Sequence, residues 1–417
     1  MNPGAVLLFM LGALSTARAQ APEAAPNENE EALAEELKTL LGAPPPPAPT
    51  GPGQSAAATN FIGVSANAVF AGGGSTAGPD ALAELQGGAH DPNQRGVTVQ
   101  NLELSLLGAV DPYFSGEVHI LFQLTPEGES AFELEEAFLV SQALPWGLQL
   151  KAGTYFTEFG RLNPQHPHVW DFVDQPVVSS RLMGGDGLRN PGARLSWLTP
   201  LPWWAEVFIG VQNSHGETAH SFLGSDEEAA LDGIAHSGRR IKTAGDMLYS
   251  ARLLQGFSPS DTTAINLGIS AATGANNSGP DARSTLGGVD LYAKWQPLNA
   301  YRGYPFVSLQ GEWMFRSYDL PDDQRRDWGS YLQAVWGFHH RWTWGVRYDC
   351  ANGNGFAAEN LPQRRRVSSN MSFVASEYSR FRLQYNYDHT DALMRGHAHS
   401  VWLQASFIIG SHGAHTF

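Results

Sequence analysis

The residues best suited to guiding ions gather in one long segment, residues 158–190, of this 417-residue chain. Its apolar side chains, among them Trp170, Phe172 and Val177, need burial. Loops longer than about 12 to 15 residues are usually functional or disordered. We therefore expect the segment to fold inward against a barrel wall and to narrow a pore, the alternative being a lid over the mouth. Its charged and imidazole groups are Arg161, His166, His168, Asp171, Asp174, Arg181 and Arg189.

More charged residues recur on the strand faces that the sequence assigns to the interior of a barrel. Arginine rings suit anion or phosphate pores, and acidic rings suit cation pores. Because basic and acidic residues are mixed, passage of anions is possible but the ion preference is not decided by the sequence. For each arginine, the alternative role is an ion pair within the wall. The residues predicted to line the lumen are Lys151, Arg194, Glu133, Glu135, Arg252, Asp290, Lys294, Glu312, Arg316, Arg347, Arg380 and Arg382.

The sequence contains only weak indications of a metal site or of an active site. His215, His220 and His236 share the connection 214–246 with several carboxylates, a donor set that zinc accepts. Their spacing matches no closed structural site, so we predict no metal and no cofactor. G-x-S-x-G, H-E-x-x-H and P-loop motifs are absent from the sequence. We expect no enzyme, although a hydrolase whose Ser, His and acidic groups meet only in space is an alternative.

The elements that position these residues are strands with strict alternation. In 263–274, Ile265, Leu267 and Ile269 alternate with small or polar residues, and 381–387 repeats the pattern. Lipid outside and water inside demand this pattern, which predicts an all-β fold: a transmembrane antiparallel β-barrel of about 16 strands. We expect strands near 60–70, 96–109, 114–124, 131–141, 147–157, 191–199, 203–213, 247–257, 262–272, 284–296, 305–318, 327–338, 340–350, 365–376, 379–389 and 396–417.

The connections between the expected strands alternate between short and long. Bacterial barrels place short turns in the periplasm and long loops outside, and an even strand number puts both termini in the periplasm. Connection 71–95, with the glycines 72–74 at its tip, is one of the long loops. The pattern therefore predicts a protein of the Gram-negative outer membrane with outer-membrane lipid as its surroundings.

Three regions follow from composition. Residues 1–19 read as a signal peptide, residues 20–59 as a short amphipathic helix with a Pro-rich periplasmic linker, and residues 60–417 as the barrel. The helix, at residues 29–42, could join subunits as a small coiled coil or remain a frayed helix. Phe417 ends the last strand, where we expect the barrel assembly machinery to bind. The net charge of −15 offers no basic footprint for nucleic acid, and a single cysteine, Cys350, excludes an internal disulfide.

Residues 98–198 also resemble a known family. They contain NLELSLLGAVDPYFSGEVHILFQL, ELEEAFL, LQLKAGTYFTEFGRLN and GLRNPGARLSWL, and they are similar to the phosphate-selective porins. The resemblance implies a 16-stranded, usually trimeric, water-filled channel with a periplasmic N-terminal segment. The arginine ladder and lysine cluster behind phosphate specificity cannot be aligned here, so that specificity is not carried over.

Relatives with similar NPQHPH and GDGLRNPGARLSWL stretches carry the label of zinc-regulated, TonB-dependent receptors. Such receptors resemble 22-stranded barrels with a plug domain, which residues 20–59 are too few to form. We therefore expect an outer-membrane porin that lets small hydrophilic solutes diffuse passively, assembled as a homotrimer. A specific receptor or transporter for a metal or its chelate is the alternative.

Overall fold

The structure is a computed structural model that describes residues 62–124, 130–225, 237–356 and 361–410. The expected signal peptide at 1–19, the whole of the region 20–59 with its helix, His236 and Phe417 therefore lie outside the described residues. None of the described helices is long and apolar enough to cross a membrane.

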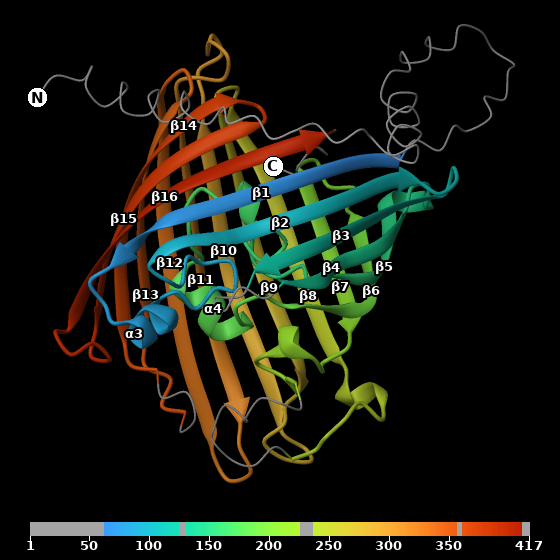
Figure 1. Cartoon of the computed structure of the whole chain (residues 1–417). Helices are drawn as coiled ribbons and strands as arrows, with labels where there is room; N and C mark the ends of the chain where they lie inside the picture. Colours follow the sequence, from blue (N-terminus) through green and yellow to red (C-terminus); the bar gives the residue numbers. More distant parts are fainter. Residues whose placement is uncertain (1–61, 125–129, 226–236, 357–360, 411–417) are drawn as a thin grey trace, which may run out of the picture. The chain divides into compact units, whose positions relative to one another are not determined.

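The described residues form sixteen antiparallel strands, each paired with its neighbour in sequence, and β1 pairs with β16 to close the barrel (Figure 1). This confirms the predicted fold. The strands are β1 Ile62–Ser75, β2 Gly96–Ala109, β3 Phe114–Leu124, β4 Ser130–Ser141, β5 Leu148–Phe156, β6 Arg189–Leu198, β7 Trp204–Gln212, β8 Leu248–Ser260, β9 Thr263–Ala275, β10 Arg283–Trp295, β11 Phe306–Asp319, β12 Gln324–His339, β13 Trp342–Ala351, β14 Arg364–Ser376, β15 Ser379–Thr390 and β16 His397–Gly410.

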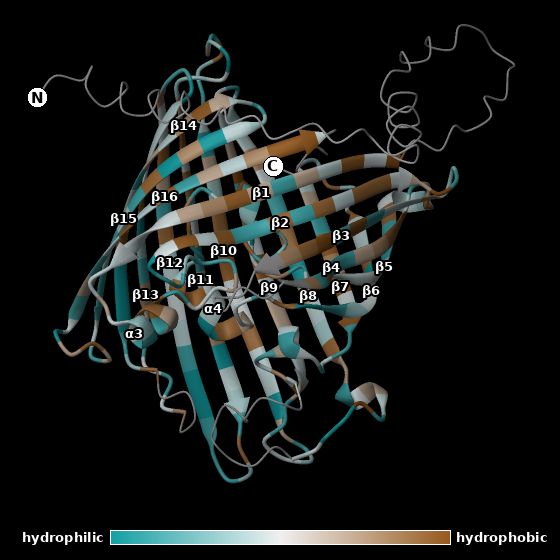
Figure 2. Cartoon of the chain, in the orientation of Figure 1, coloured by the Kyte–Doolittle hydropathy of each residue, from teal (hydrophilic) through white to brown (hydrophobic). Residues whose placement is uncertain are grey.

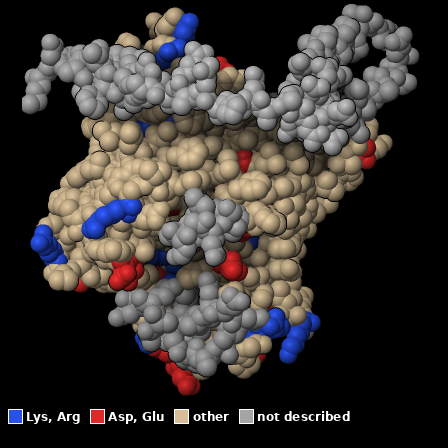
Figure 3. Space-filling view, in the orientation of Figure 1, with Lys and Arg blue, Asp and Glu red and all other residues tan. Residues whose placement is uncertain are grey.

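Alternate residues of each strand face opposite sides of the wall. In β15, Leu383 is 53% exposed whereas the next residue, Gln384, is 0% exposed, and in β9 Ile269 is exposed beside the buried Ser270. The strands change between polar and apolar along their length in Figure 2, and Figure 3 shows a wide uncharged area over the strands of the visible face. The outward residues form the apolar surface that lipid requires, and the inward ones are polar.

The end of β1 differs from the prediction. The strand continues to Ser75, so glycines 72–74 pair with β16 instead of forming a loop tip. A Cβ atom on Gly73 would clash with the carbonyl oxygen of Val401 and lie 2.7 Å from Cε3 of Trp402. Glycine is needed there because the ring of Trp402 is completely buried against the strand. β12 also begins three residues before the expected position, at Gln324.

The connection between β1 and β2 folds back onto the wall. Its helix α3, Pro79–Leu85, buries Leu82 and Leu85 in a cluster with Trp402 and Val173. Val173 belongs to the connection between β5 and β6, so two connections meet inside the barrel.

The connection between β5 and β6, residues 157–188, folds inward, as predicted. We call it the inward segment. Its helix α4, Val177–Met183, packs on β11, β12 and β13 and lies among the strands in Figure 1. Its apolar side chains Val178, Leu182 and Met183 are buried in a core cluster with residues of the wall. The alternative of a lid over the mouth is therefore wrong.

Candidate functional site

One contact of the inward segment with the wall is at β10 and β11. The backbone N–H of Leu162 donates to Oε1 of Glu312 at 2.8 Å, and Nε of Arg161 donates to Oε1 of Gln310 at 3.2 Å. The guanidinium carbon of Arg161 also lies 3.8 Å from the ring centre of Tyr292. Glu312, which is predicted to line the lumen, thereby fixes the backbone of the segment.

Asp174 makes the second contact, with strands β13 to β15. Its carboxylate accepts hydrogen bonds from Arg347 at 2.7 Å, Arg366 at 3.0 Å, Gln384 at 2.9 Å and Asn386 at 2.6 Å. Burial by itself would raise the pKa of Asp174, but the two guanidinium groups and the two amides outweigh burial and lower this pKa to about 2. Asp174 is therefore a buried, ionised anchor of the inward segment.

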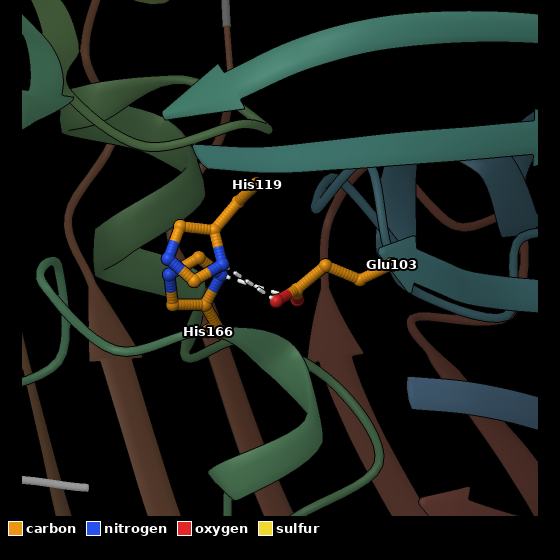
Figure 4. Close-up of side chains that lie close together, drawn as sticks. All are labelled: Glu103, His119 and His166. Atoms are coloured by element: carbon orange, nitrogen blue, oxygen red, sulfur yellow. Dashed lines mark hydrogen bonds and ion pairs between the residues drawn. The ribbon is translucent and has the colours of Figure 1, made fainter. Parts of the chain in front are cut away.

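His166 makes the third contact, on β2 to β4. Its Nδ1 lies 3.2 Å from Oε2 of Glu103 and 3.0 Å from Oε2 of Glu135, while its Nε2 lies 2.9 Å from Oε2 of Glu136. Figure 4 shows the Glu103 carboxylate pointing at both His166 and His119, whose Nδ1 lies 3.0 Å from Oε1. Burial opposes protonation of His166, but Glu135 and Glu103 raise its pKa well above the usual value.

A β-bulge brings two successive carboxylates to this place. His119 pairs with Glu136 and Ile120 pairs with Leu134, so Glu135 is an extra residue on β4. The bulge lets both Glu135 and Glu136 reach His166, which strict alternation does not allow. For that reason strict alternation in the sequence places Glu135 on the lumen side and does not indicate Glu136.

Four of the six arginines predicted to line the lumen, and Arg189 of the predicted constriction, are held in ion pairs. The pairs fix the shape of the wall, which is the alternative role left open for each arginine, and they leave little guanidinium free for solutes. They are Arg189 with Glu133, Arg194 with Glu158 at 3.3 Å, Arg252 with Asp290 at 3.0 Å, Arg316 with Asp327 at 2.8 Å, and Arg347 with Asp349 at 2.8 Å.

Other arginines bind backbone carbonyls at the edges of the inward segment. Arg380 donates to the carbonyl of His168 at 2.7 Å, and Arg382 donates to that of Trp170 at 2.8 Å. Arg181 of α4 reaches out of the segment, to the carbonyl of Asn352 at 3.0 Å. These bonds satisfy carbonyl groups that a buried loop would otherwise leave without partners.

The remaining predicted residues make contacts of their own. Asp171 accepts a hydrogen bond from Gln333 at 3.1 Å. The amines of Lys151 and Lys294 lie 4.1 Å and 5.2 Å from the ring centres of Phe138 and Phe306.

Of the three histidines expected as weak metal candidates, His236 lies outside the described residues, and His215 and His220 do not belong to a group with metal-ligand geometry. Among the described residues, the group whose donor atoms lie close enough to share an ion is Glu103, His119 and His166. His215 and His220 lie in the connection between β7 and β8, outside this group. Sequence spacing could not reveal it, because its members come from two strands and the inward segment.

No family model matches the chain. An uncharacterized protein of Aquifex aeolicus is 30% identical over 351 residues, which cover 78% of this chain and 71% of that protein. The chain belongs to the family of this Aquifex aeolicus protein. Because the Aquifex aeolicus protein is itself uncharacterized, membership in this family does not assign a function to the chain.

Solved structures show the same fold at low sequence identity. The outer membrane channel DcaP of Acinetobacter baumannii has a TM-score of 0.55 at 12% identity, covering 86% of this chain and 99% of that one. The anion-selective porin of Comamonas acidovorans has a TM-score of 0.50 at 9% identity, covering 84% and 98%. OmpT of Vibrio cholerae in its trimer form has 0.51 at 8% identity, covering 84% and 99%. The fold is that of outer-membrane porins, and the TonB-dependent receptor alternative finds no support in these neighbours.

Proposed function

We propose that the protein is an outer-membrane porin through which small hydrophilic solutes diffuse passively, with the inward segment as its constriction. The observation that carries the proposal is the path of this segment, which bonds to Glu312 of β11, to Arg347 of β13 and to Glu103 of β2. A polar segment that contacts widely separated strands of a closed barrel reduces the space for solutes. The apolar outer surface suits lipid.

The same proposal includes the surroundings and the assembly. Both termini would lie in the periplasm, beside the short turns, and Phe417 would be bound by the barrel assembly machinery. The porin-like fold, together with a neighbour solved in a trimer form, supports a homotrimer. Size-exclusion chromatography with light scattering in detergent gives the oligomeric state, and a mass of one chain would contradict the trimer.

Charge near the short turns supports a preference for anions. Lys151 lies near the start of β5, Lys294 near the end of β10 and Arg380 near the start of β15, and all three are partly exposed. Two carboxylates on the wall at the same end, Glu117 and Glu206, oppose them, and in the short turns Asp111, Asp261 and Glu377 oppose Arg302 and Arg341. The proposed anion preference therefore rests on the wall residues alone, where cations outnumber carboxylates by one and would concentrate small anions in the lumen.

Planar lipid bilayers provide the experiment. Purified protein should insert in uniform conductance steps, and a KCl gradient should give a reversal potential of the sign that anion preference produces. Replacing both Lys151 and Lys294 by Gln should move the reversal potential toward zero or toward cation preference. Failure to conduct, or turnover of ester substrates without conductance, would contradict the proposed function.

A further inference from the structure

Two histidines and a glutamate from three separate elements converge at the foot of the inward segment. Glu103 belongs to β2, His119 to β3 and His166 to the inward segment, and all three are buried. One donor atom from each lies within 4.8 Å of the others. Glu103 lies between the two imidazoles, 3.0 Å from Nδ1 of His119 and 3.2 Å from Nδ1 of His166 (Figure 4).

These separations suit a small divalent ion. Zinc binds nitrogen and carboxylate oxygen at about 2.0 to 2.2 Å in tetrahedral geometry, which places neighbouring donor atoms about 3.3 to 3.5 Å apart. The two measured separations are within a few tenths of an ångström of that range, although they end on different oxygens of Glu103, Oε1 toward His119 and Oε2 toward His166. Small side-chain rotations would therefore open the centre of the triad for an ion.

The outer partners of both imidazoles favour the same interpretation. A histidine that binds a metal through one ring nitrogen usually donates the other N–H to a carboxylate, which orients the ring. Nε2 of His166 lies 2.9 Å from Oε2 of Glu136, and Nε2 of His119 lies 3.5 Å from Oε2 of Glu117. Each ring thus directs Nδ1 toward Glu103 and Nε2 toward another carboxylate.

A fourth donor is close at hand on either side. Oε2 of Glu135 lies 3.0 Å from Nδ1 of His166, and Nδ1 of His168 lies 3.3 Å from Oε2 of Glu103. The carboxylates of Glu103, Glu135 and Glu136 also place concentrated negative charge in a buried place, where a nearby cation is strongly favoured. A divalent ion supplies that charge more compactly than protonated imidazoles do.

We propose that Glu103, His119 and His166 bind one divalent transition-metal ion of the zinc class, with Glu135 or His168 completing a closed tetrahedral site. The ion joins the inward segment to β2 and β3. Its role is structural, because all its ligands come from the protein and the site is buried. The site does not depend on the proposed channel function, since the contacts hold whatever passes through the barrel.

Metal analysis of the full-length protein in detergent tests the site. After removal of metal by chelator, equilibrium dialysis against Zn²⁺ with mass-spectrometric detection should give one ion per chain. Glu103→Gln, His119→Gln and His166→Gln should each abolish stoichiometric binding. Glu136→Gln keeps the ligands but loses the outer partner, so its affinity should fall about 10- to 100-fold. His389→Gln, at an exposed histidine of β15, is the matched control and should bind as the wild type does.

Heat-modifiable migration in SDS gels, in which folded barrels migrate differently from unfolded chains, shows whether each variant is assembled. Co²⁺ bound to the wild-type protein gives a second readout that needs no variant: a tetrahedral site with nitrogen donors produces intense visible absorption. Absence of stoichiometric zinc in the wild type, an octahedral Co²⁺ spectrum, or unchanged binding in the assembled His166→Gln variant would each overturn the proposal.

Discussion

Asp174 is the residue on which the position of the inward segment most depends. It is fully buried and receives donors from three successive strands, β13 to β15. Removing one partner of a buried ion pair is strongly destabilising because the other charge remains buried and uncompensated. Here one carboxylate is shared by two buried arginines, Arg347 and Arg366, which pair on their other sides with Asp349 and Asp388.

The substitution Asp174→Asn should lower the free energy of unfolding by about 1.5 to 3 kcal/mol, because charge-assisted hydrogen bonds are lost while Asp349 and Asp388 still compensate the two arginines. Asp171→Asn is the matched control, because Asp171 is only partly buried and accepts a hydrogen bond from the neutral side chain of Gln333. Urea titration of the refolded barrel in detergent measures both variants. Equal midpoints for the two would show that the buried pair is not an anchor.

The same carboxylate predicts an acid transition. The pKa of Asp174 is lowered from 3.8 to about 2, so the folded state binds its proton more weakly than the unfolded chain does. The stabilisation is fully present above about pH 4 and is lost as the pH falls toward 2. Nearby Asp91, whose pKa is raised to about 7 by burial and by Asp174, titrates in a separate and higher range.

Conductance recorded between pH 5 and pH 2 checks this transition. The wild-type channel should change its conductance below pH 4 as the segment loosens, and the Asp174→Asn channel should lack that step. An identical acid response in both proteins would assign the transition to other groups.

Sequence reasoning at this scale recovered the anchors on the segment but few of their partners. Asp174 and His166 were predicted, since a long segment with both charged and apolar residues indicates an inward loop. Glu103 and His119 were missed because alternation alone does not say which inward side chains the segment will contact. Glu136 was missed because a bulge breaks the two-residue period.

Among the elements, the strands were predictable because lipid and water impose opposite demands on alternate residues. The predicted end of β1 was wrong because its glycines 72–74 resemble a turn, whereas the strand continues to Ser75. Because Gly73 has no side chain, the ring of Trp402 packs against the strand at this point, and Trp402 also packs on α3. The sequence alone does not indicate that Gly73 lies against Trp402, because that contact follows only from the pairing of β1 with β16.

Gly73→Ala should consequently weaken barrel closure by about 1 to 3 kcal/mol, as overpacking does. Gly74→Ala is the control, because its Cβ would have Cγ of Arg95 as its nearest neighbour at an ordinary 3.6 Å. The folded fraction after refolding, read from heat-modifiable gel migration, compares the two. A lower folded fraction for the Gly74 variant than for the Gly73 variant would contradict the packing argument.

At the scale of the whole molecule, closure of the sixteen-stranded barrel does not depend on the inward segment. Neighbouring strands bond to one another around the whole ring, so the wall needs no contribution from the lumen to satisfy its backbone groups. The segment in turn is held by side chains and carbonyls that project from the finished wall. Removing part of the segment should therefore leave the wall able to close.

Single-channel recording of a variant lacking residues 165–178 tests the central claim most directly. This deletion removes the contacts of His166 and Asp174 while retaining the sixteen strands. If the inward segment is the constriction, assembled variant channels should conduct several-fold more current than wild-type channels at the same voltage and salt concentration. Unchanged conductance, in channels shown to be assembled by heat-modifiable migration, would contradict the account.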